Sequence, residues 1–257
     1  MSKSRLLYQL VAPLDVVVGP DEPARRAAFL ERFAQADTAI EVRTPACGRD
    51  SIESAWDAAI VGPYLVDGVL QAEAEGFDAA IIGCFSDPVL DAAREAADIP
   101  VIGPGQAAVH FALQLGDRVS VISPNDGDPG RSRAFMRSIG LEDRLASARG
   151  MGLSVPELAR SNEAALDRIA DTARSCVSED GADVLILGCM SMAFLDPTPA
   201  LVARLGVPVI NPVIAALKTA EMTLAHGLTQ SRARWPRSQG KPLIQSTIPS
   251  MKQGEFT

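Results

Sequence analysis

Two cysteines occupy matching positions in the sequence, each directly after an acidic residue, a short apolar run and a glycine. Cys84 lies in DAAIIGCFSDP (78–88), and Cys189 lies in DVLILGCMSMAF (183–194). The electropositive setting of a strand-to-helix junction lowers the pKa of a thiol, which makes it a base or a nucleophile. Two such thiols, facing each other across a pocket, could remove a proton from one face of a tetrahedral carbon and return one to the other face. We therefore expect Cys84 and Cys189 to act as an exchangeable acid and base.

The two remaining cysteines lack this context. Cys176 falls within a predicted long helix, where a free cysteine is usually a small buried hydrophobe, and Cys47 lies in a predicted loop. None of the four cysteines has CxxC spacing, and the chain has only 2 histidines, so the sequence predicts no metal site. A buried structural thiol would also explain either matched cysteine taken singly, but the repetition of the segment favours a functional pair.

The elements around the matched cysteines alternate between strands and helices. Short apolar runs predict strands at 6–11, 40–43, 79–83, 101–102, 118–123, 184–188 and 207–210. Helical periodicity or helix signals predict helices between them, among them 22–36, 51–75, 129–139, 156–179 and 214–226. Gly62-Pro63 is expected to break or kink the second of these helices. Apolar, non-alternating strands separated by helices are typical of parallel sheets covered on both faces, so we expect an α/β fold.

The order of the elements repeats along the chain. IPVIGPGQAA (99–108) in the first half matches VPVINPVIAA (207–216) in the second. We predict two pseudo-symmetric halves, 1–115 and 116–230, each a parallel sheet flanked by helices, with the active-site cleft between them. Ligands of parallel α/β sheets bind beyond the carboxyl ends of the strands, where both cysteines are expected. The remaining segment, 231–257, is locally basic and rich in Pro and Ser, which predicts a surface arm or a partly disordered tail.

The composition excludes several classes of function. The chain of 257 residues has a net charge of −8, so no basic field for nucleic acid extends over most of it. No apolar run reaches the ~18 residues of a membrane helix, and the N-terminal sequence does not resemble a signal peptide. We therefore expect a cytoplasmic protein that binds a small molecule, neither a membrane nor nucleic acid. That setting also disfavours structural disulfides.

Several residues near the predicted strand ends are candidates for substrate binding. The backbone N–H groups after each cysteine could stabilise negative charge on a carbonyl oxygen. Ser123 ends the strand that opens the second half, where it could contact the ligand or serve only the structure. Asn211 ends the last strand and could contact the cleft or shape the turn. The candidates beside the cysteines are Phe85, Ser86, Met190 and Ser191.

Three further features have structural explanations that we prefer. Asp87 is expected to cap the helix that follows it rather than to act as a base, and His110 is expected to be structural. Gly103-Pro104-Gly105 lacks the spacing of a Rossmann or P-loop motif, so nucleotide binding is not expected.

Around these cysteines the sequence resembles the aspartate/glutamate/hydantoin racemase superfamily, and most of all its hydantoin and allantoin racemase branch. The segments that carry the resemblance are GCFSDPVLDAAREAADIPVIGPGQAAVHFA (83–112), LGCMSMA (187–193) and SIESAWDAA (51–59). The resemblance implies a racemase without a cofactor that inverts the carbon at position 5 of a hydantoin ring. It also implies that Cys84 and Cys189 are the paired catalytic residues and that the protein is a homo-oligomer.

The sequence differs from the other branches of this superfamily, and at one segment it also differs from the hydantoin branch that it resembles most. Where the amino-acid branch has Cys-Asn-Thr and Cys-Thr-Glu, this chain has Cys84-Phe85-Ser86 and Cys189-Met190-Ser191, which disfavours free aspartate or glutamate as substrate. The decarboxylase branch keeps only one of the two cysteines, so the presence of both Cys84 and Cys189 disfavours decarboxylation. The hydantoin branch usually has an Asn-Pro-Asn-Thr-like segment after its first strand. Here that segment is Ala12-Pro13-Leu14-Asp15, so Pro13 and Asp15 become candidate contacts.

Alternative functions remain open at the level of the sequence. Addition of a cysteine to a double bond would give cis–trans isomerisation of an unsaturated acid. An amino-acid racemase of the aspartate or glutamate type is a second alternative. A non-catalytic protein that keeps the cleft is a third, and it would show ordinary thiol pKa values near ~8.5.

Overall fold

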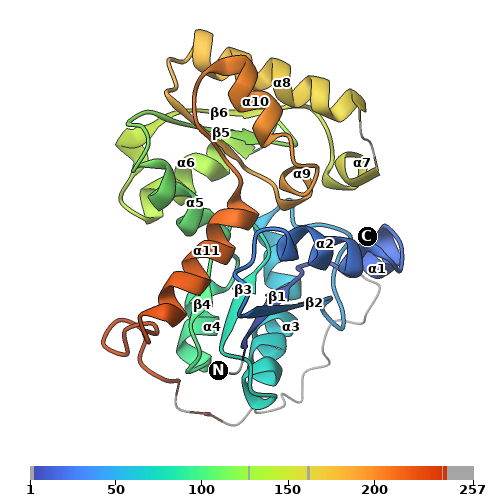
Figure 1. Ribbon diagram of the computed structural model, residues 1–257, viewed down its shortest axis with the longest axis vertical. Coiled ribbons are helices and arrows are strands. Elements are labelled where there is room, and N and C mark those ends of the chain that lie inside the picture. The colour runs from blue at the N-terminus through green and yellow to red at the C-terminus, as the bar shows by residue number, and fades with distance from the viewer. Residues whose placement is uncertain (1–2, 127, 161–162, 239, 242–257) are drawn as a thin grey trace, which may run out of the picture.

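The computed structural model contains two four-stranded sheets, one in each half of the chain (Figure 1). The structure describes residues 3–126, 128–160, 163–238 and 240–241. The first sheet has the strand order β2-β1-β3-β4, the second has β6-β5-β7-β8, and every pairing is parallel. Because the two sheets share one order, the predicted α/β fold with two pseudo-symmetric halves is confirmed.

The first half of the chain forms the first sheet. Its inner strands β1 and β3 have buried side chains on both faces, because successive side chains of a strand point to opposite sides. Leu6 and Tyr8 join the main hydrophobic core, whereas Leu7 joins a second cluster with the apolar side chains of α3. In chain order the elements are β1 (Ser4–Gln9), α1 (Leu14–Val17), α2 (Glu22–Glu31), β2 (Thr38–Arg43), α3 (Ala55–Ala74), β3 (Ala79–Ile82), α4 (Leu90–Ala96), β4 (Val101–Ile102) and α5 (Pro104–Ala112).

The second half repeats this plan. A single helix was expected over 156–179, but two helices, α7 and α8, occupy that region. Strand β6 was not predicted, because only Leu145 of its six residues is buried and the strand gains its order by pairing with β5. The elements are β5 (Val119–Ser123), α6 (Asp128–Ser138), the 3-10 turn η1 (Glu142–Arg144), β6 (Leu145–Gly150), α7 (Val155–Arg160), α8 (Glu163–Ser178), β7 (Val184–Leu187), α9 (Met190–Ala193), α10 (Thr198–Leu205), β8 (Val209–Ile210) and α11 (Pro212–Ala225).

Helix α3 corrects two expectations. It begins after Ser54, whose hydroxyl accepts a hydrogen bond from the backbone N–H of Asp57 at 3.1 Å, and not at Ser51. It also continues through Pro63 without a break. A proline inside a helix costs about 3 kcal/mol. The buried side chains that α3 packs on the first sheet, Val61, Leu65 and Val69, offset that cost.

Helices α5 and α11 exchange places between the halves (Figure 1). Helix α5 follows the last strand of the first sheet but packs against β7 and β8 of the second. Helix α11 follows the last strand of the second sheet and packs against β3 and β4 of the first, with α5 alongside. The main core is therefore continuous through both halves. The predicted boundary at 115/116 falls between the two sheets along the chain, but the helices that cover the sheets are shared.

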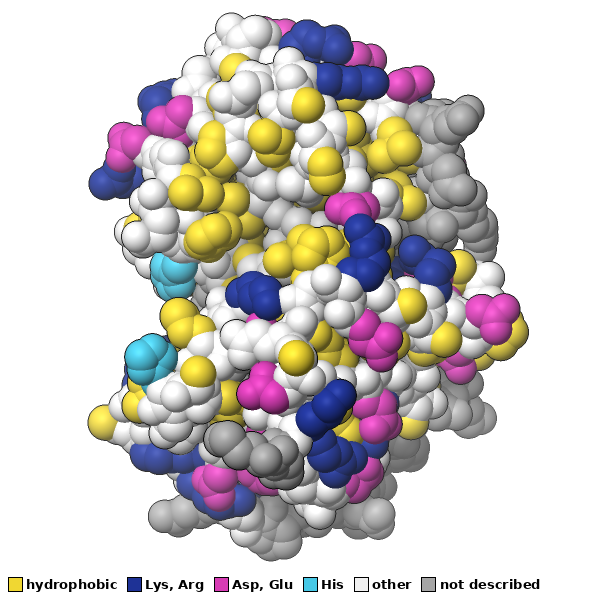
Figure 2. Space-filling model, viewed as in Figure 1, with side chains coloured by type: hydrophobic (Ala, Val, Ile, Leu, Met, Phe, Trp, Pro, Cys, Tyr) yellow, Lys and Arg dark blue, Asp and Glu magenta, His cyan; other side chains and the backbone are white. Residues whose placement is uncertain are grey.

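The surface mixes charges of both signs. On the face drawn in Figure 2, acidic and basic side chains are interspersed among apolar ones. Within the described part of the chain, no helix has the length and apolar character needed to cross a membrane. The same residues contain no cluster of three or more His, Cys, Asp or Glu side chains that could hold a metal ion.

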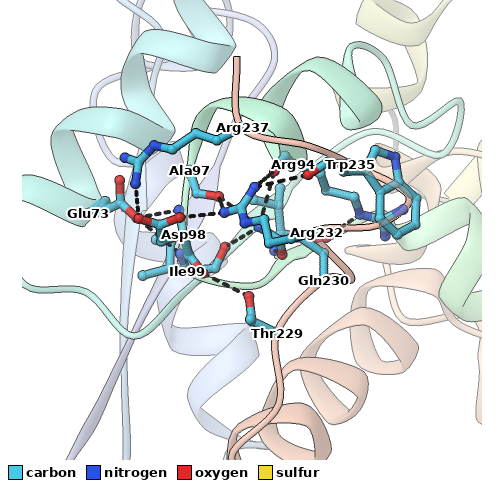
Figure 3. Close-up of polar contacts among 11 residues, drawn as sticks. Glu73, Arg94, Ala97, Asp98, Ile99, Thr229, Gln230, Arg232, Trp235 and Arg237 are labelled. Carbon is cyan, nitrogen blue, oxygen red and sulfur yellow. Dashed lines mark hydrogen bonds and ion pairs between the residues drawn. The ribbon is translucent and has the colours of Figure 1, made fainter. Parts of the chain in front are cut away.

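A segment that follows α11 returns over α4 and β4, and we call residues 229–238 the strap (Figure 3). The Gln230 amide nitrogen donates to the carbonyl oxygens of Ala97 and Ile99 at 2.9 and 3.0 Å. The Trp235 ring lies 4.7 Å from the guanidinium of Arg94, and its indole N–H donates to Asp91. The first residues of the predicted tail are therefore packed on the same chain, whereas 239 and 242–257 lie outside the described residues.

Candidate active site

A cavity of about 320 Å³ lies between the two halves, and both Cys84 and Cys189 line it. Strand β3 ends at Ile82 and β7 ends at Leu187, so each cysteine is the second residue beyond the end of its strand. These strands hold equivalent places in the two sheets, next to β1 and β5. The cavity is therefore formed where the carboxyl ends of two parallel sheets face each other, at the low end of the ~300–1,000 Å³ typical of small-molecule sites.

The glycine before each cysteine lies flush against the neighbouring strand. Gly83 donates its N–H to the carbonyl of Gln9 at 2.8 Å, and Gly188 donates to the carbonyl of Ile122 at 2.7 Å. A Cβ atom on Gly83 would lie 2.6 Å from Cε1 of Tyr8, and one on Gly188 would lie 2.8 Å from the Ile122 oxygen. Both separations are too short for real atoms, so the repeated Gly-Cys pair reflects one packing requirement met twice.

Cys189 is the buried member of the pair, with 9% of its surface exposed. It immediately precedes α9. Burial is the main cause that raises the pKa of the Cys189 thiol to about 11, and the charge of Cys84 adds to it. The backbone N–H groups of Met192 and Ser191 and the guanidinium of Arg26 lower this pKa in part. Cys189 is therefore a protonated thiol at neutral pH, and the lowered thiol pKa expected from the sequence at this junction is wrong for Cys189 because burial outweighs the helix N-terminus.

Cys84 is the more accessible member of the pair. Its Sγ lies 3.3 Å from the Ser86 hydroxyl oxygen, and either atom could donate the hydrogen. The backbone N–H groups of Phe85 and Ser86 have no acceptor among the described residues. On the other side, the N–H group of Met190 belongs to the first turn of α9, where no intrahelical acceptor exists, whereas the N–H group of Ser191 already donates to the Cys189 sulfur. Backbone donors are therefore available beside both sulfur atoms.

The cavity lining includes some of the predicted contacts and leaves out others. Phe85, Ser86, Ser123, Met190 and Ser191 all line it. Pro13, Asp15 and Asn211 do not appear among the lining residues, and the loop after β1 instead presents Ala12 and Leu14. The candidate contacts Pro13 and Asp15 therefore do not contribute to the lining, and the part of the wall formed by this loop is apolar.

Asn211 has a structural task. Its Oδ1 accepts the N–H groups of Val213 and Ile214 at 3.0 and 3.4 Å, which caps α11. Its Nδ2 donates to the carbonyl of Ala193 at 2.9 Å and thereby ties α9 to α11. Of the two roles considered for Asn211, contact with the cleft and shaping of the turn, the structure shows the second.

Asp87 caps a different helix from the one expected. Its carboxylate accepts the N–H groups of Gly105 and Gln106 at 2.8 Å each, at the start of α5 rather than α4. Burial raises the pKa of Asp87 to about 7, although these two hydrogen bonds and the nearby Arg94 lower it. Asp87 thus joins the Cys84 loop to a helix that packs on the second sheet.

The other residues considered in the sequence lie away from the cavity. Cys176 is fully buried in the main core, as expected. Cys47 is exposed, and His110 is exposed on α5. Neither residue lines the cavity.

The chain matches a protein-family model over residues 25–220, and the description of that model is Asp/Glu/hydantoin racemase. The chain belongs to the Asp/Glu/hydantoin racemase family. It is a racemase, an isomerase, similar to the hydantoin racemase of Pseudomonas sp. (strain NS671), with 34% identity over 78% of this chain and 80% of that one. The hydantoin racemase of Paenarthrobacter aurescens is 36% identical over 76% of this chain and 83% of its own length.

Solved structures of the family agree with the fold. The allantoin racemase from Klebsiella pneumoniae superimposes with a TM-score of 0.86 at 28% identity, covering 95% of this racemase and 97% of the other chain. At this coverage the shared arrangement extends over both halves.

Sequence reasoning missed several residues that line the cavity of this racemase. They come from α2, from the loop before α3, from the loop after β5, from α6 and from the start of α7. The most unusual is Arg26, which falls on the apolar stripe of the helix predicted over 22–36, at spacings of three, four and seven residues from Phe29, Leu30 and Phe33. A cation on an apolar stripe was the signal that could have revealed it. The missed residues include Arg26, Asp50, Ser51, Ile52, Glu53, Ser54, Asn125, Arg131, Ser132, Phe135 and Val155.

Proposed function

We propose that this racemase inverts carbon 5 of a 5-substituted hydantoin or a similar cyclic ureide, using Cys84 and Cys189 and no cofactor. One observation carries the proposal: two thiols at equivalent positions of two pseudo-symmetric halves line one cavity. The relatives named above are hydantoin and allantoin racemases, and both substrates are cyclic ureides with a hydrogen on the stereogenic carbon. That shared chemistry supports the choice of substrate class.

The reaction needs one thiolate and one thiol. The thiolate removes the proton from carbon 5, and the electron pair moves onto the neighbouring carbonyl oxygen to give a planar enolate. The opposite thiol then delivers its proton to the other face of carbon 5, and its sulfur becomes the thiolate. Atoms and charge balance, and the enzyme ends in the mirror-image protonation state. Since Cys189 is a thiol at neutral pH, we infer that Cys84 is the first base and Cys189 the first acid.

The enolate oxygen needs hydrogen-bond donors. Phe85 and Ser86 line the cavity beside Cys84, and Met190 lines it beside Cys189, so we infer that the backbone N–H groups of these residues supply the donors. A fixed donor aimed at developing charge contributes about 3–4 kcal/mol to catalysis. The apolar wall formed by Ala12 and Leu14 excludes water from the other side of the ring.

Racemisation in deuterated water tests the proposal. The purified protein is incubated with single enantiomers of 5-substituted hydantoins, with allantoin, and with L-aspartate and L-glutamate. We expect loss of optical rotation together with uptake of one deuterium at carbon 5 for at least one cyclic ureide. Both amino acids should remain unchanged.

Two outcomes would contradict the proposal. Racemisation of aspartate or glutamate but of no cyclic ureide would overturn the substrate class. A covalent thioether adduct with an unsaturated acid, seen by mass spectrometry with turnover of that acid, would instead establish cis–trans isomerisation.

A further inference from the structure

Arg26 places a buried positive charge on the wall of the cavity. Its side chain is 2% exposed, yet it lines the cavity together with Cys189. Its Nε donates to Glu22 Oε1 at 2.7 Å, and its guanidinium carbon lies 4.5 Å from the centre of the Phe194 ring. Its Nη2 donates to the Ser191 hydroxyl at 3.3 Å, across the junction between the halves.

Stability of the fold alone does not account for a buried charge at position 26. Arg26 occupies an apolar stripe of α2, where a hydrophobic side chain of similar volume would pack without desolvating a charge. Replacing a buried ion pair by packed apolar side chains is often neutral or stabilising. Two of the three guanidinium nitrogens are engaged, and Nη1 has no hydrogen-bond partner among the described residues. A role in the cavity would account for the charge.

The groups that face the Cys189 sulfur come from four elements. Cys84 follows β3, Tyr8 lies on β1, and the N–H groups of Ser191 and Met192 belong to α9. Burial raises the pKa of Tyr8 far above its ordinary value, so Tyr8 stays neutral. Arg26 of α2 is the cation in this set, and its charge opposes the effect of burial on the pKa of Cys189.

Glu22 moderates that charge. Burial would raise the pKa of Glu22, but hydrogen bonds from Arg25 and Arg26 outweigh burial and lower it, so Glu22 is an anion. The Glu22–Arg26 pair is therefore ionised, and Arg26 is the member of the pair that lines the cavity. An ionised pair gives a favourable field at the sulfur without leaving an unpaired buried charge.

We propose that Arg26 is a positioning residue for the reaction: it holds the Ser191 hydroxyl in place and supplies the positive charge that allows the Cys189 sulfur to become negative. The inference rests on the proposed use of Cys189 as an acid and base. In each catalytic cycle Cys189 gives up its proton, and without Arg26 the resulting thiolate would form in an apolar pocket. Loss of the Arg26 charge should therefore lower the fraction of Cys189 that is thiolate, even when no substrate is bound.

Alkylation of Cys189 without substrate measures this effect. In a Cys84→Ser background, the rate of iodoacetamide labelling of the Cys189 peptide is followed by mass spectrometry at about pH 9, where the rate is proportional to the thiolate fraction. We expect Arg26→Met to slow labelling by about tenfold, which corresponds to one unit of pKa. Arg26→Lys keeps the charge and should stay within about threefold of the parent.

Arg32→Met is the matched control. Arg32 lies just beyond the same helix, contacts the rings of Phe29 and Phe33, and bonds Asp196 across the halves at 3.0 Å, but it does not line the cavity. Its replacement should leave the labelling of Cys189 unchanged. Labelling of the fully buried Cys176 reports unfolding in every variant.

A second variant keeps the test decisive if Arg26→Met unfolds. Glu22→Gln removes the anion that offsets Arg26, so labelling of Cys189 should become faster by at least about threefold. An unchanged or faster rate in folded Arg26→Met, or a slower rate in Glu22→Gln, overturns the inference. Neither result depends on turnover, so a racemase that fails every cyclic ureide would refute the proposed function and leave this result intact.

Discussion

At the scale of single residues, the two halves of the site are not chemically equal. Cys189 is buried and its pKa is raised to about 11, whereas Cys84 is partly exposed and lies 3.3 Å from the Ser86 hydroxyl. In the mechanism that we propose, this asymmetry favours one arrangement of acid and base in the resting enzyme. Asp87, three residues after Cys84, holds the Cys84 loop against α5, and its protonation is coupled to folding.

The Asp87 carboxyl should make stability depend on pH. Its pKa of about 7 in the folded protein lies above its ordinary value of 3.8, so folding favours the protonated form. This contribution is fully present below about pH 4 and is lost as the pH rises through about 7. Urea unfolding of wild type and Asp87→Asn should therefore show a stability difference that shifts against wild type by about 2–4 kcal/mol between those limits.

The exposed carboxyl of Asp67 on α3 serves as the control for this measurement. Asp67→Asn should track wild type at every pH. A difference between wild type and Asp87→Asn that is independent of pH would show that Asp87 keeps an ordinary pKa.

At the scale of elements, the site depends on how closely the strand ends pack. Gly83 and Gly188 let the backbone of each cysteine pass directly beside β1 and β5. Gly105 does the same at the start of α5, where a Cβ atom would collide with the carbonyl oxygen of Phe85. The positions of both sulfur atoms are thus set by glycines whose neighbours cannot move without disturbing a sheet.

Gly188→Ala should therefore harm both folding and catalysis. The added Cβ would lie 2.7 Å from Val121 Cγ1 and 2.8 Å from the Ile122 oxygen. Overpacking of this kind costs about 1–3 kcal/mol, and the displaced Cys189 should lower kcat/KM by more than the loss of stability explains. Gly130→Ala on α6 is the control, since its Cβ meets no atom within 4 Å and should stabilise the helix by up to about 1 kcal/mol. Equal behaviour of the two variants would contradict the packing account.

Prediction from the sequence worked where local pattern determines structure. The buried strands β3 and β7 and the glycines beyond them have clear apolar patterns, so their ends and their cysteines could be placed. Strand β6 could not, because an edge strand with one buried residue is ordered by its partner rather than by its own sequence. The role of Asp87 was also missed, since the helix that it caps begins 17 residues further along the chain, at Pro104.

At the scale of the whole molecule, the exchanged helices make the two halves depend on each other. Helix α5 covers the second sheet and α11 covers the first, so neither half keeps a closed core without the other. The strap adds further hydrogen bonds between the segment that follows α11 and the C-terminal part of α4 (Figure 3). None of this exchange is visible in the order of elements, because periodicity shows that a helix has an apolar face but not which sheet it covers.

The shared core predicts a single unfolding transition. Trp56 on α3 and Trp235 on the strap report the first half through fluorescence, and the buried Cys176 reports the second through pulse alkylation. Urea titrations followed by the two probes should give the same midpoint, as expected for one cooperative unit. Labelling of Cys176 at urea concentrations that leave the fluorescence unchanged would show that the halves unfold separately.

The central claim is that Cys84 and Cys189 act on opposite faces of one carbon, and exchange by the single-cysteine variants tests it most directly. Each variant, Cys84→Ser or Cys189→Ser, is incubated in deuterated water with each enantiomer of a substrate of the wild-type enzyme, and deuterium at carbon 5 is followed by NMR. We expect neither variant to racemise the substrate, and any exchange that persists to be confined to one enantiomer, opposite for the two variants. Full racemisation by either variant, or exchange of the same enantiomer by both, would contradict the two-cysteine mechanism.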